Sequence, residues 1–180
     1  MFFYTGCVCV DDLSGVRFIV DEMFGNVVRW LRILGFDTLD ASSLRSGPGE
    51  DIDTKILLRA LEEGRVLVTA DVGLARRAEK LGVRVILFSR GENDVCWILR
   101  RVLREVGIES MDGLDMFSRC PLCNGVLRSV AKEEVKDRVP EGVFERVDEF
   151  WVCENCGKIY WVGSHFKNIR KTISCVFSGV

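Results

Sequence analysis

Short apolar runs rich in branched side chains alternate with longer amphipathic segments from residue 16 to about residue 110. The runs expected to form strands lie at 17–20, 36–39, 66–69 and 83–88. The segments with a helical spacing of apolar residues lie at 24–34, 53–64, 74–81 and 95–106. Strands that alternate with amphipathic helices are typical of a parallel sheet with helices on its faces. The pattern therefore predicts an α/β fold with a mostly parallel sheet of at least four strands.

The pattern changes after residue 107, where short cysteine-bearing turns replace it. A charged stretch at 132–138 is expected to hold a helix, and aromatic strands are expected at 150–152 and 159–162. We therefore divide the chain into an N-terminal extension (1–15), an α/β domain (16–112), a small cysteine-bearing domain (113–174) and a tail (175–180).

Composition narrows the class of protein. The 180 residues are 48% hydrophobic and 29% charged and include three prolines, which excludes a disordered or fibrous chain. The formal net charge of -2 excludes a protein that holds nucleic acid by bulk charge alone. No run reaches the roughly 18 to 20 apolar residues of a membrane span, and no basic segment precedes the apolar residues near the N-terminus. We therefore predict a cytoplasmic protein that does not associate with membranes.

The chain has one histidine, His165, against eight cysteines and 27 acidic residues. A single histidine excludes ribonucleases that use two histidines as acid and base, and zinc hydrolases that need three histidine ligands. The candidate chemistry therefore rests on carboxylates and thiolates.

Three aspartates stand where predicted strands lead into predicted helices, namely Asp21, Asp53 and Asp71. The carboxyl ends of parallel strands line the crevice where open α/β sheets bind ligands, so we expect Asp21 and Asp71 in one cleft. Asp53 joins them if the start of its helix lies above the same edge of the sheet. Crowded carboxylates repel one another unless a hard cation holds them, which favours Mg²⁺ or Mn²⁺ and hydrolysis of a phosphodiester. Glu22 and Asp51 are candidate further ligands. The alternative is that each aspartate only caps its helix, a role for which aspartate is preferred.

Four of the eight cysteines form two C-x2-C pairs, Cys120 with Cys123 and Cys153 with Cys156. Two such pairs can place four thiolates in a tetrahedron around Zn²⁺, and this zinc is structural, because four cysteine ligands leave no open position for catalysis. Paired disulfides, a redox dithiol and an iron–sulfur cluster are the competing interpretations. The remaining cysteines show no such spacing and have no predicted role; they are Cys7, Cys9, Cys96 and Cys175.

Basic side chains near the expected cleft are candidates to hold phosphates. Arg29 and Arg32 lie three residues apart and so share a face of the first predicted helix. An arginine can bind a phosphate through two parallel hydrogen bonds. The alternative for this pair is a solvated helix face, or an ion pair with Asp37 or Asp40.

The end of the chain is locally basic. After residue 155 it carries four basic and no acidic side chains, interleaved with aromatic residues. Aromatic rings stack on unpaired bases while cations neutralise phosphates, a combination that suits single-stranded RNA. Lys167, Arg170 and Lys171 are the candidate RNA contacts. We expect the aromatic residues Trp151, Tyr160 and Trp161 to form the core of the cysteine-bearing domain instead.

Taken together, these motifs resemble a known family. They are Phe18-Ile19-Val20-Asp21, Arg29-Trp30-Leu31-Arg32, the run from Ala60 to Asp71 that ends in Thr-Ala-Asp, and Cys120-Pro-Leu-Cys123. The chain from about residue 16 to residue 171 is similar to the Mut7-C ribonuclease domain, a PIN-like nuclease fold of three layers joined to a zinc ribbon.

The resemblance implies a site as well as a fold. PIN-like nucleases hold divalent metal on aspartates at the positions of Asp21, Asp53 and Asp71. Many also carry an acid two residues after the last of these, where this chain has Gly73. That difference leaves open a one-metal site, or a second ion on Glu22 or Asp51.

The sequence thus predicts a metal-dependent ribonuclease, of the endonuclease type, whose zinc ribbon assists the binding of RNA with single-stranded regions. The alternative is a non-catalytic RNA-binding module with a degenerate PIN-like site. A phospho-acceptor receiver domain ranks last, because the lysine expected after a late strand is replaced by Ser89-Arg90-Gly91. The sequence leaves the RNA target and a homo-oligomer open.

Overall fold

The computed structural model of the chain describes residues 15–45, 47, 51–164 and 166–178. Cys7, Cys9, nearly all of the expected N-terminal extension and His165 lie outside the described residues. Among the described residues, no helix combines the length and apolar character that a membrane span requires.

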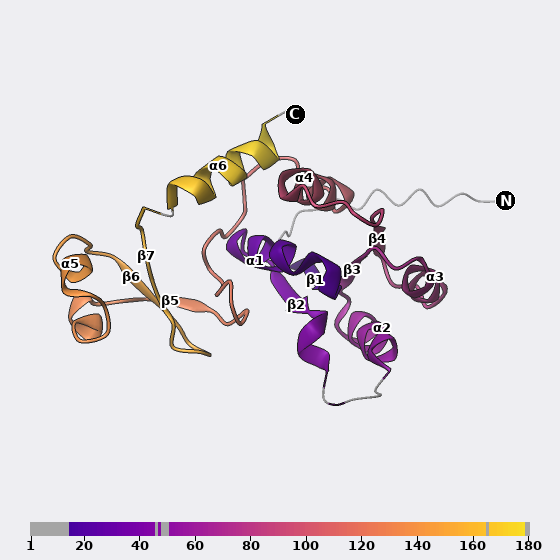
Figure 1. Cartoon of the computed structure of the whole chain (residues 1–180), viewed down its shortest axis with the longest axis horizontal. Helices are drawn as coiled ribbons and strands as arrows, with labels where there is room; N and C mark the ends of the chain where they lie inside the picture. The colour runs from indigo at the N-terminus through magenta and orange to yellow at the C-terminus, as the bar shows by residue number, and fades with distance from the viewer. Residues whose placement is uncertain (1–14, 46, 48–50, 165, 179–180) are drawn as a thin grey trace.

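A four-stranded parallel sheet forms the centre of the first part of the chain (Figure 1). Its order is β2 (Asp37–Asp40), β1 (Arg17–Val20), β3 (Val66–Thr69) and β4 (Val85–Leu87). All three pairings are parallel, and Val20 of β1 lies opposite Asp40 of β2 and Val68 of β3. The predicted α/β class and the parallel sheet are confirmed.

Alternating side chains of the strands feed two separate apolar cores. On one face Phe18, Val20 and Val68 pack against α1 (Gly25–Ile33) and α4 (Val95–Glu105). On the other face Ile19 and Leu67 pack against α2 (Ile52–Glu63) and α3 (Val72–Lys80). Strands buried on both faces read as continuous apolar runs, which is why the sequence shows them clearly. The three-layer arrangement is confirmed.

The cysteine-bearing region forms an antiparallel sheet of β5 (Leu127–Val130), β6 (Phe150–Cys153) and β7 (Ile159–Trp161). We call this sheet, with its cysteine turns, the zinc ribbon. The helix expected at 132–138 is a short 3-10 turn, η4 (Lys132–Val135), and a short helix, α5 (Glu141–Phe144), follows it. The 3-10 turns η2 (Glu22–Phe24) and η3 (Ala41–Leu44) belong to the parallel layer.

The core of the ribbon differs from the prediction. It is built from Val130, Val135, Phe150 and Val152, whereas Trp161 is 37% exposed. Trp161 lies on β7 opposite Phe150 of β6, and within the described part of the chain no further strand pairs with the outer side of β7. A core position for Trp161 is therefore wrong, and its ring is partly open to solvent.

The final helix, α6 (Phe166–Phe177), returns to the parallel layer. Its Ile173 and Val176 are buried in the core shared with α1 and α4. A disulfide joins Cys96 of α4 to Cys175 of α6 across 79 residues of sequence. The Arg100 guanidinium donates to carbonyl oxygens at the end of α6, including that of Val176 at 3.1 Å. The sequence did not predict this helix, and the expected division of the chain at residues 112 and 174 stays a prediction.

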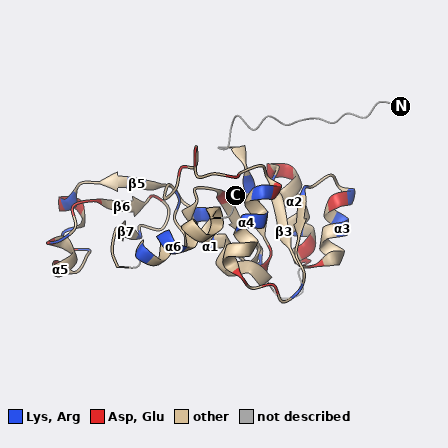
Figure 2. Ribbon diagram, turned by 90° about the horizontal axis from the view of Figure 1, so that it is seen from above, with Lys and Arg blue, Asp and Glu red and all other residues tan. Residues whose placement is uncertain are grey.

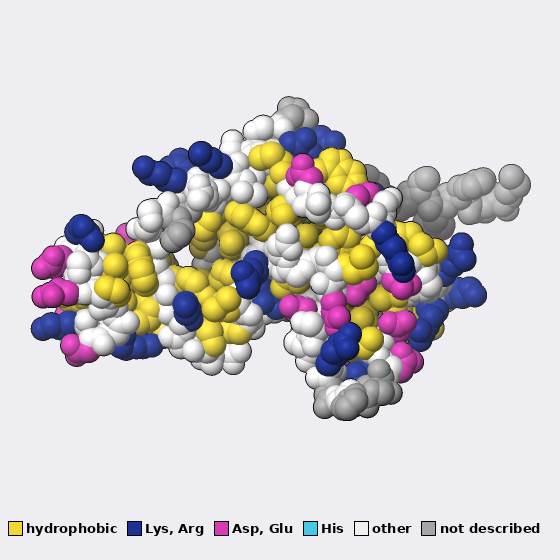
Figure 3. All heavy atoms as spheres, viewed as in Figure 1, with side chains coloured by type: hydrophobic (Ala, Val, Ile, Leu, Met, Phe, Trp, Pro, Cys, Tyr) yellow, Lys and Arg dark blue, Asp and Glu magenta, His cyan; other side chains and the backbone are white. Residues whose placement is uncertain are grey.

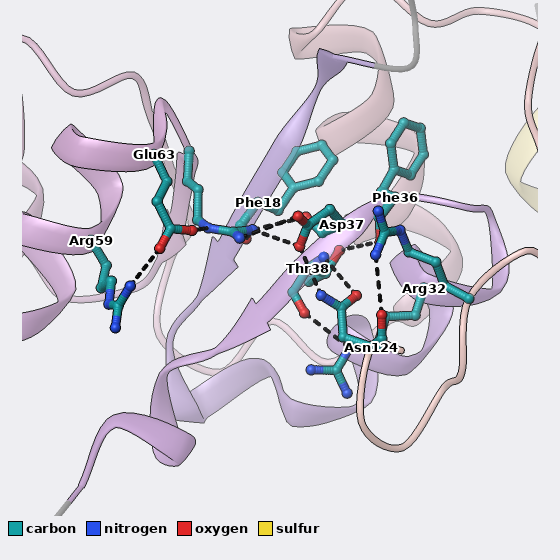
Figure 4. Close-up of polar contacts among 10 residues, drawn as sticks. Phe18, Arg32, Phe36, Asp37, Thr38, Arg59, Glu63 and Asn124 are labelled. Atoms are coloured by element: carbon teal, nitrogen blue, oxygen red, sulfur yellow. Dashed lines mark hydrogen bonds and ion pairs between the residues drawn. The ribbon is translucent and has the colours of Figure 1, made fainter. Parts of the chain in front are cut away.

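Hydrogen bonds of the first cysteine turn hold the ribbon against β2, an edge strand of the parallel sheet (Figure 4). The side-chain oxygen of Asn124 accepts a hydrogen bond from the Thr38 N–H at 3.1 Å, and its amide nitrogen donates to Asp37 at 2.7 Å. Arg65 also binds Asp37, at 2.9 Å. Burial raises the pKa of Asp37, but the hydrogen bonds from Arg65 and Asn124 outweigh burial and lower it. Asp37 is therefore the ionised centre of this contact.

Arg32 is the buried member of the same contact. Its guanidinium donates to the Thr38 carbonyl at 2.9 Å and to the carbonyls of Pro121 and Leu122 at 3.2 and 2.9 Å. The residue is 5% exposed. The solvated face suggested for Arg32 is therefore wrong, and its hydrogen bonds join β2 to the first cysteine turn.

Candidate metal sites and nucleic-acid surface

Asp21 and Asp71 lie side by side because β1 and β3 are neighbours in the sheet. The Asp21 N–H continues the β1–β3 pairing by donating to the Val68 carbonyl at 2.9 Å. The Thr69 hydroxyl donates to the Asp21 carboxylate at 2.7 Å and accepts from the Asp71 N–H at 2.9 Å. Since a hydroxyl both donates and accepts, Thr69 ties the two aspartates together. In the Thr-x-Asp motif of this chain, the threonine hydroxyl therefore links the aspartate of the motif to Asp21.

Asp53 lies in the first turn of α2 and faces the same end of the sheet. Burial raises its pKa, Arg77 opposes that rise, and the negative charges of Asp51, Asp71 and Asp21 add to it. The pKa of Asp53 therefore responds to all three neighbouring carboxylates. We call Asp21, Asp53 and Asp71, together at this end of the sheet, the acidic edge.

Helix capping accounts for part of this arrangement. Asp21 accepts from the Glu22 N–H at 2.7 Å, and Asp71 accepts from the Leu74 N–H at 2.8 Å. Asp53 is not a cap, because Asp51 caps α2 by accepting from the Thr54 N–H at 3.2 Å. Capping therefore explains Asp21 and Asp71 in part, and does not explain Asp53, whose carboxylate lies in the first turn and pairs with Arg77.

Two arginines that the sequence analysis missed neutralise this region. Arg77 of α3 contacts Asp53 at 3.1 Å and Asp51 at 3.9 Å. Arg45 contacts Glu22 at 2.5 Å, so this candidate ligand is engaged in an ion pair. Arg77 follows Asp71 by six residues, on the helix that Asp71 caps. This short spacing could have indicated from the sequence that Arg77 lies near the acidic edge.

The acidic edge offers the oxygen ligands that Mg²⁺ and Mn²⁺ prefer. Among the described residues, the sulfurs of the four cysteines all lie within 4.8 Å of one another. The carboxylate oxygens of the acidic edge are spread more widely than this. A side chain at residue 73 would begin 3.1 Å from a carboxylate oxygen of Asp71. Gly73 therefore lies at the site without adding a fourth acid.

The four cysteines meet as predicted. Cys120 and Cys156 have their sulfurs 3.7 Å apart, and those of Cys123 and Cys153 are 3.3 Å apart. A regular tetrahedron with Zn–S bonds of about 2.3 Å has edges of about 3.8 Å, so the four sulfurs fit one zinc ion. The two turns pack so closely that a side chain at Gly125 would begin 2.9 Å from the Cys153 sulfur.

The crowded thiols release a first proton readily. Burial raises the pKa of Cys123, but hydrogen bonds from the Gly125 N–H and the other thiols outweigh it and lower the pKa to about 6. Burial raises the pKa of Cys153 and the Cys123 thiol adds to this rise, while hydrogen bonds from the backbone N–H groups of Cys156 and Asn155 and from the Cys156 thiol oppose it. Zinc binding requires thiolates, and a dipositive ion supplies the charge that stabilises the rest.

The basic residues that the sequence suggested as RNA contacts differ in exposure. Arg32 is buried, whereas the others lie on the surface. Arg29 is exposed on α1, while Lys167, Arg170 and Lys171 are exposed on α6. Figure 2 shows basic positions in blue along the α6 ribbon. The structure therefore leaves Arg29 and the α6 cations as accessible candidates for RNA contact.

The parallel layer with its acidic edge, joined to a four-cysteine ribbon, defines a three-layer α/β domain with an attached zinc ribbon. The model of the Mut7-C RNAse domain matches residues 16–173, nearly the whole chain, and the chain belongs to this family. A search of curated proteins and a search of solved structures each found no match. Family membership indicates a ribonuclease-type function and RNA as the substrate.

Proposed function

We propose that this protein is a ribonuclease, of the endonuclease type, that hydrolyses RNA with Mg²⁺ or Mn²⁺ held at the acidic edge. The observation that carries the proposal is the hydrogen-bonded unit of Asp21, Thr69 and Asp71, with Asp53 at the same end of the sheet. Capping does not require these three carboxylates to lie at one end of the sheet. Their shared location in a chain of a ribonuclease family favours a cation ligand set. Their oxygens do not all lie within 4.8 Å of one another, so a bound cation would have to draw them together.

The three aspartates and Thr69 have two different tasks. Asp21, Asp53 and Asp71 would hold the cation, and Thr69 fixes the first and last of them in place. Once bound, the cation would orient water and neutralise charge on the phosphodiester. Asp51 and Glu22 remain candidate further ligands, each engaged with an arginine.

The test is a cleavage assay on labelled RNA with single-stranded regions. Protein that retains its zinc but has been stripped of weakly bound divalent ions should leave the RNA intact, and added Mn²⁺ or Mg²⁺ should restore cleavage within the strand. Zinc content is measured before and after stripping, so that loss of the ribbon is not mistaken for loss of the catalytic ion. Unchanged cleavage in the stripped protein would contradict the carboxylate–metal proposal.

Arg77 should compete with the cation for Asp53. Replacing it by glutamine removes an exposed ion pair worth about 0.5 to 1 kcal/mol, so the Mn²⁺ concentration for half-maximal cleavage should fall about threefold. Arg76→Gln is the matched control, because Arg76 is the adjacent exposed arginine on α3. An unchanged Mn²⁺ requirement with a raised KM for RNA would show instead that Arg77 binds the substrate.

A non-catalytic RNA-binding module is the second candidate function. Gly73 and the ion pair between Arg77 and Asp53 favour it, because the first leaves out an acid and the second engages one. Under this alternative the wild-type protein binds RNA but does not cleave it at any Mn²⁺ or Mg²⁺ concentration. The same assay therefore separates the two functions.

A further inference from the structure

A groove of about 670 Å³ runs between the zinc ribbon and the start of α6. Its apolar walls include Val143 and Val147 beside α5, Trp161 of β7, and Phe166 and Ile169 of α6. Figure 3 shows apolar side chains around this hollow, with basic side chains beside it. Volumes of about 300 to 1,000 Å³ are typical of sites that bind small organic groups.

The charge of the groove favours an anionic occupant. Arg146 and Lys158 are the charged residues among the described residues that line it, and both are exposed. On α6, Lys167 and Arg170 each follow directly after a lining residue and are also exposed. Apolar walls would suit many partners, but cations beside exposed aromatic rings suit a polyanion with stacking groups.

We propose that this groove binds an unpaired segment of the RNA substrate, with bases against Trp161 and Phe166 and phosphates at Lys158 and Arg146. The proposal rests on the proposed function for the identity of RNA as the ligand. It assigns the ribbon a defined binding site and gives the exposed face of Trp161 a role. An unpaired strand fits better than a duplex, because the flat faces of paired bases are already stacked.

The test is binding of a fluorescent oligouridine of ten nucleotides, measured by anisotropy without added Mg²⁺ or Mn²⁺. Trp161→Ala should weaken binding about tenfold, while Trp161→Phe keeps an aromatic face and should stay within about twofold of the wild type. Lys158→Glu should weaken binding about tenfold and reduce its salt dependence. Lys136→Glu is the matched control, since Lys136 is an exposed lysine of the ribbon outside the groove.

The result that would overturn the proposal is wild-type affinity in both Trp161→Ala and Lys158→Glu. Equal weakening by Lys136→Glu would also overturn it, because the effect would then be one of net charge. Equally tight binding of a blunt RNA duplex at the groove would contradict the proposal of an unpaired segment. If the protein bound no RNA, the proposal would be overturned and the apolar groove would suit a protein partner instead. Thermal unfolding and zinc content check the fold, and Lys158→Glu decides the case if Trp161→Ala does not fold.

The binding assay and the cleavage assay test the two proposals separately, so either proposal can be contradicted while the other is supported. RNA that binds through the groove but is not cut with Mn²⁺ would contradict the proposed catalysis and support the groove. RNA that is cut normally by the groove variants, with unchanged affinity, would support catalysis and contradict the groove.

Discussion

Replacing Asp21 by asparagine should reduce RNA cleavage by at least about a thousandfold, while RNA affinity stays within about twofold. The carboxylate of Asp21 is the acid that Thr69 joins to Asp71, at the junction of β1 and β3. Asparagine keeps the size of the side chain and an oxygen for the Glu22 N–H, but it loses the negative charge that a cation ligand needs. A loss of about 4 kcal/mol of transition-state stabilisation corresponds to this rate change.

Single-turnover cleavage, RNA anisotropy and thermal unfolding together decide this prediction. The control is Asp148→Asn, which removes the same charge from an ion pair with Lys132 on the ribbon and should cleave normally. Cleavage by Asp21→Asn at the wild-type rate would show that the acidic edge is not the catalytic site. A large fall in the unfolding midpoint would show that Asp21 acts mainly by holding η2 in place.

Loss of zinc should unfold the ribbon and abolish its contacts with the parallel layer. Cys156→Ser removes an exposed ligand sulfur, and we expect less than about a tenth of one zinc ion per chain in the purified variant. Structural zinc sites of this kind have apparent binding free energies of about 10 to 16 kcal/mol, far more than the small core around Phe150 can replace. Protease cleavage between residues 119 and 164 should therefore become fast.

Asn155→Ser is the matched control, because Asn155 is an exposed residue between Cys153 and Cys156 and offers no sulfur. Elemental analysis, proteolysis and cleavage of RNA are compared for the two variants. Zinc at one ion per chain in Cys156→Ser, with wild-type protease resistance, would contradict a four-cysteine site. A zinc-free ribbon that remains folded would show that its apolar core suffices.

The parts of the fold that the sequence predicted are those whose causes are local or periodic. Continuous apolar strands and amphipathic helices follow from side-chain spacing, and the two C-x2-C pairs follow from ligand geometry. The carboxyl ends of β1 and β3 bring Asp21 and Asp71 together because the strands are parallel neighbours. The sequence could therefore place these two acids without knowing any loop.

The contacts that the sequence did not predict join distant residues. Arg32 has the spacing of a surface arginine, and only the cysteine turn 89 residues later supplies the carbonyl of Pro121 that helps bury it. The disulfide of Cys96 and Cys175 depends in the same way on the return of α6. The apolar strand pattern predicts a core position for Trp161, but among the described residues β7 is an edge strand with no neighbour on its outer side, and Trp161 is partly exposed there.

The return of α6 also has a consequence for the order in which the protein can be completed during synthesis. Ile173 and Val176 belong to the same core as Phe18 and Val20 of the first strand. That core is therefore incomplete until the chain has been extended past the ribbon and α6 has been made. The helix that completes the core follows the first strand by more than 140 residues, so all four cysteines of the zinc site are synthesised before the parallel layer can close.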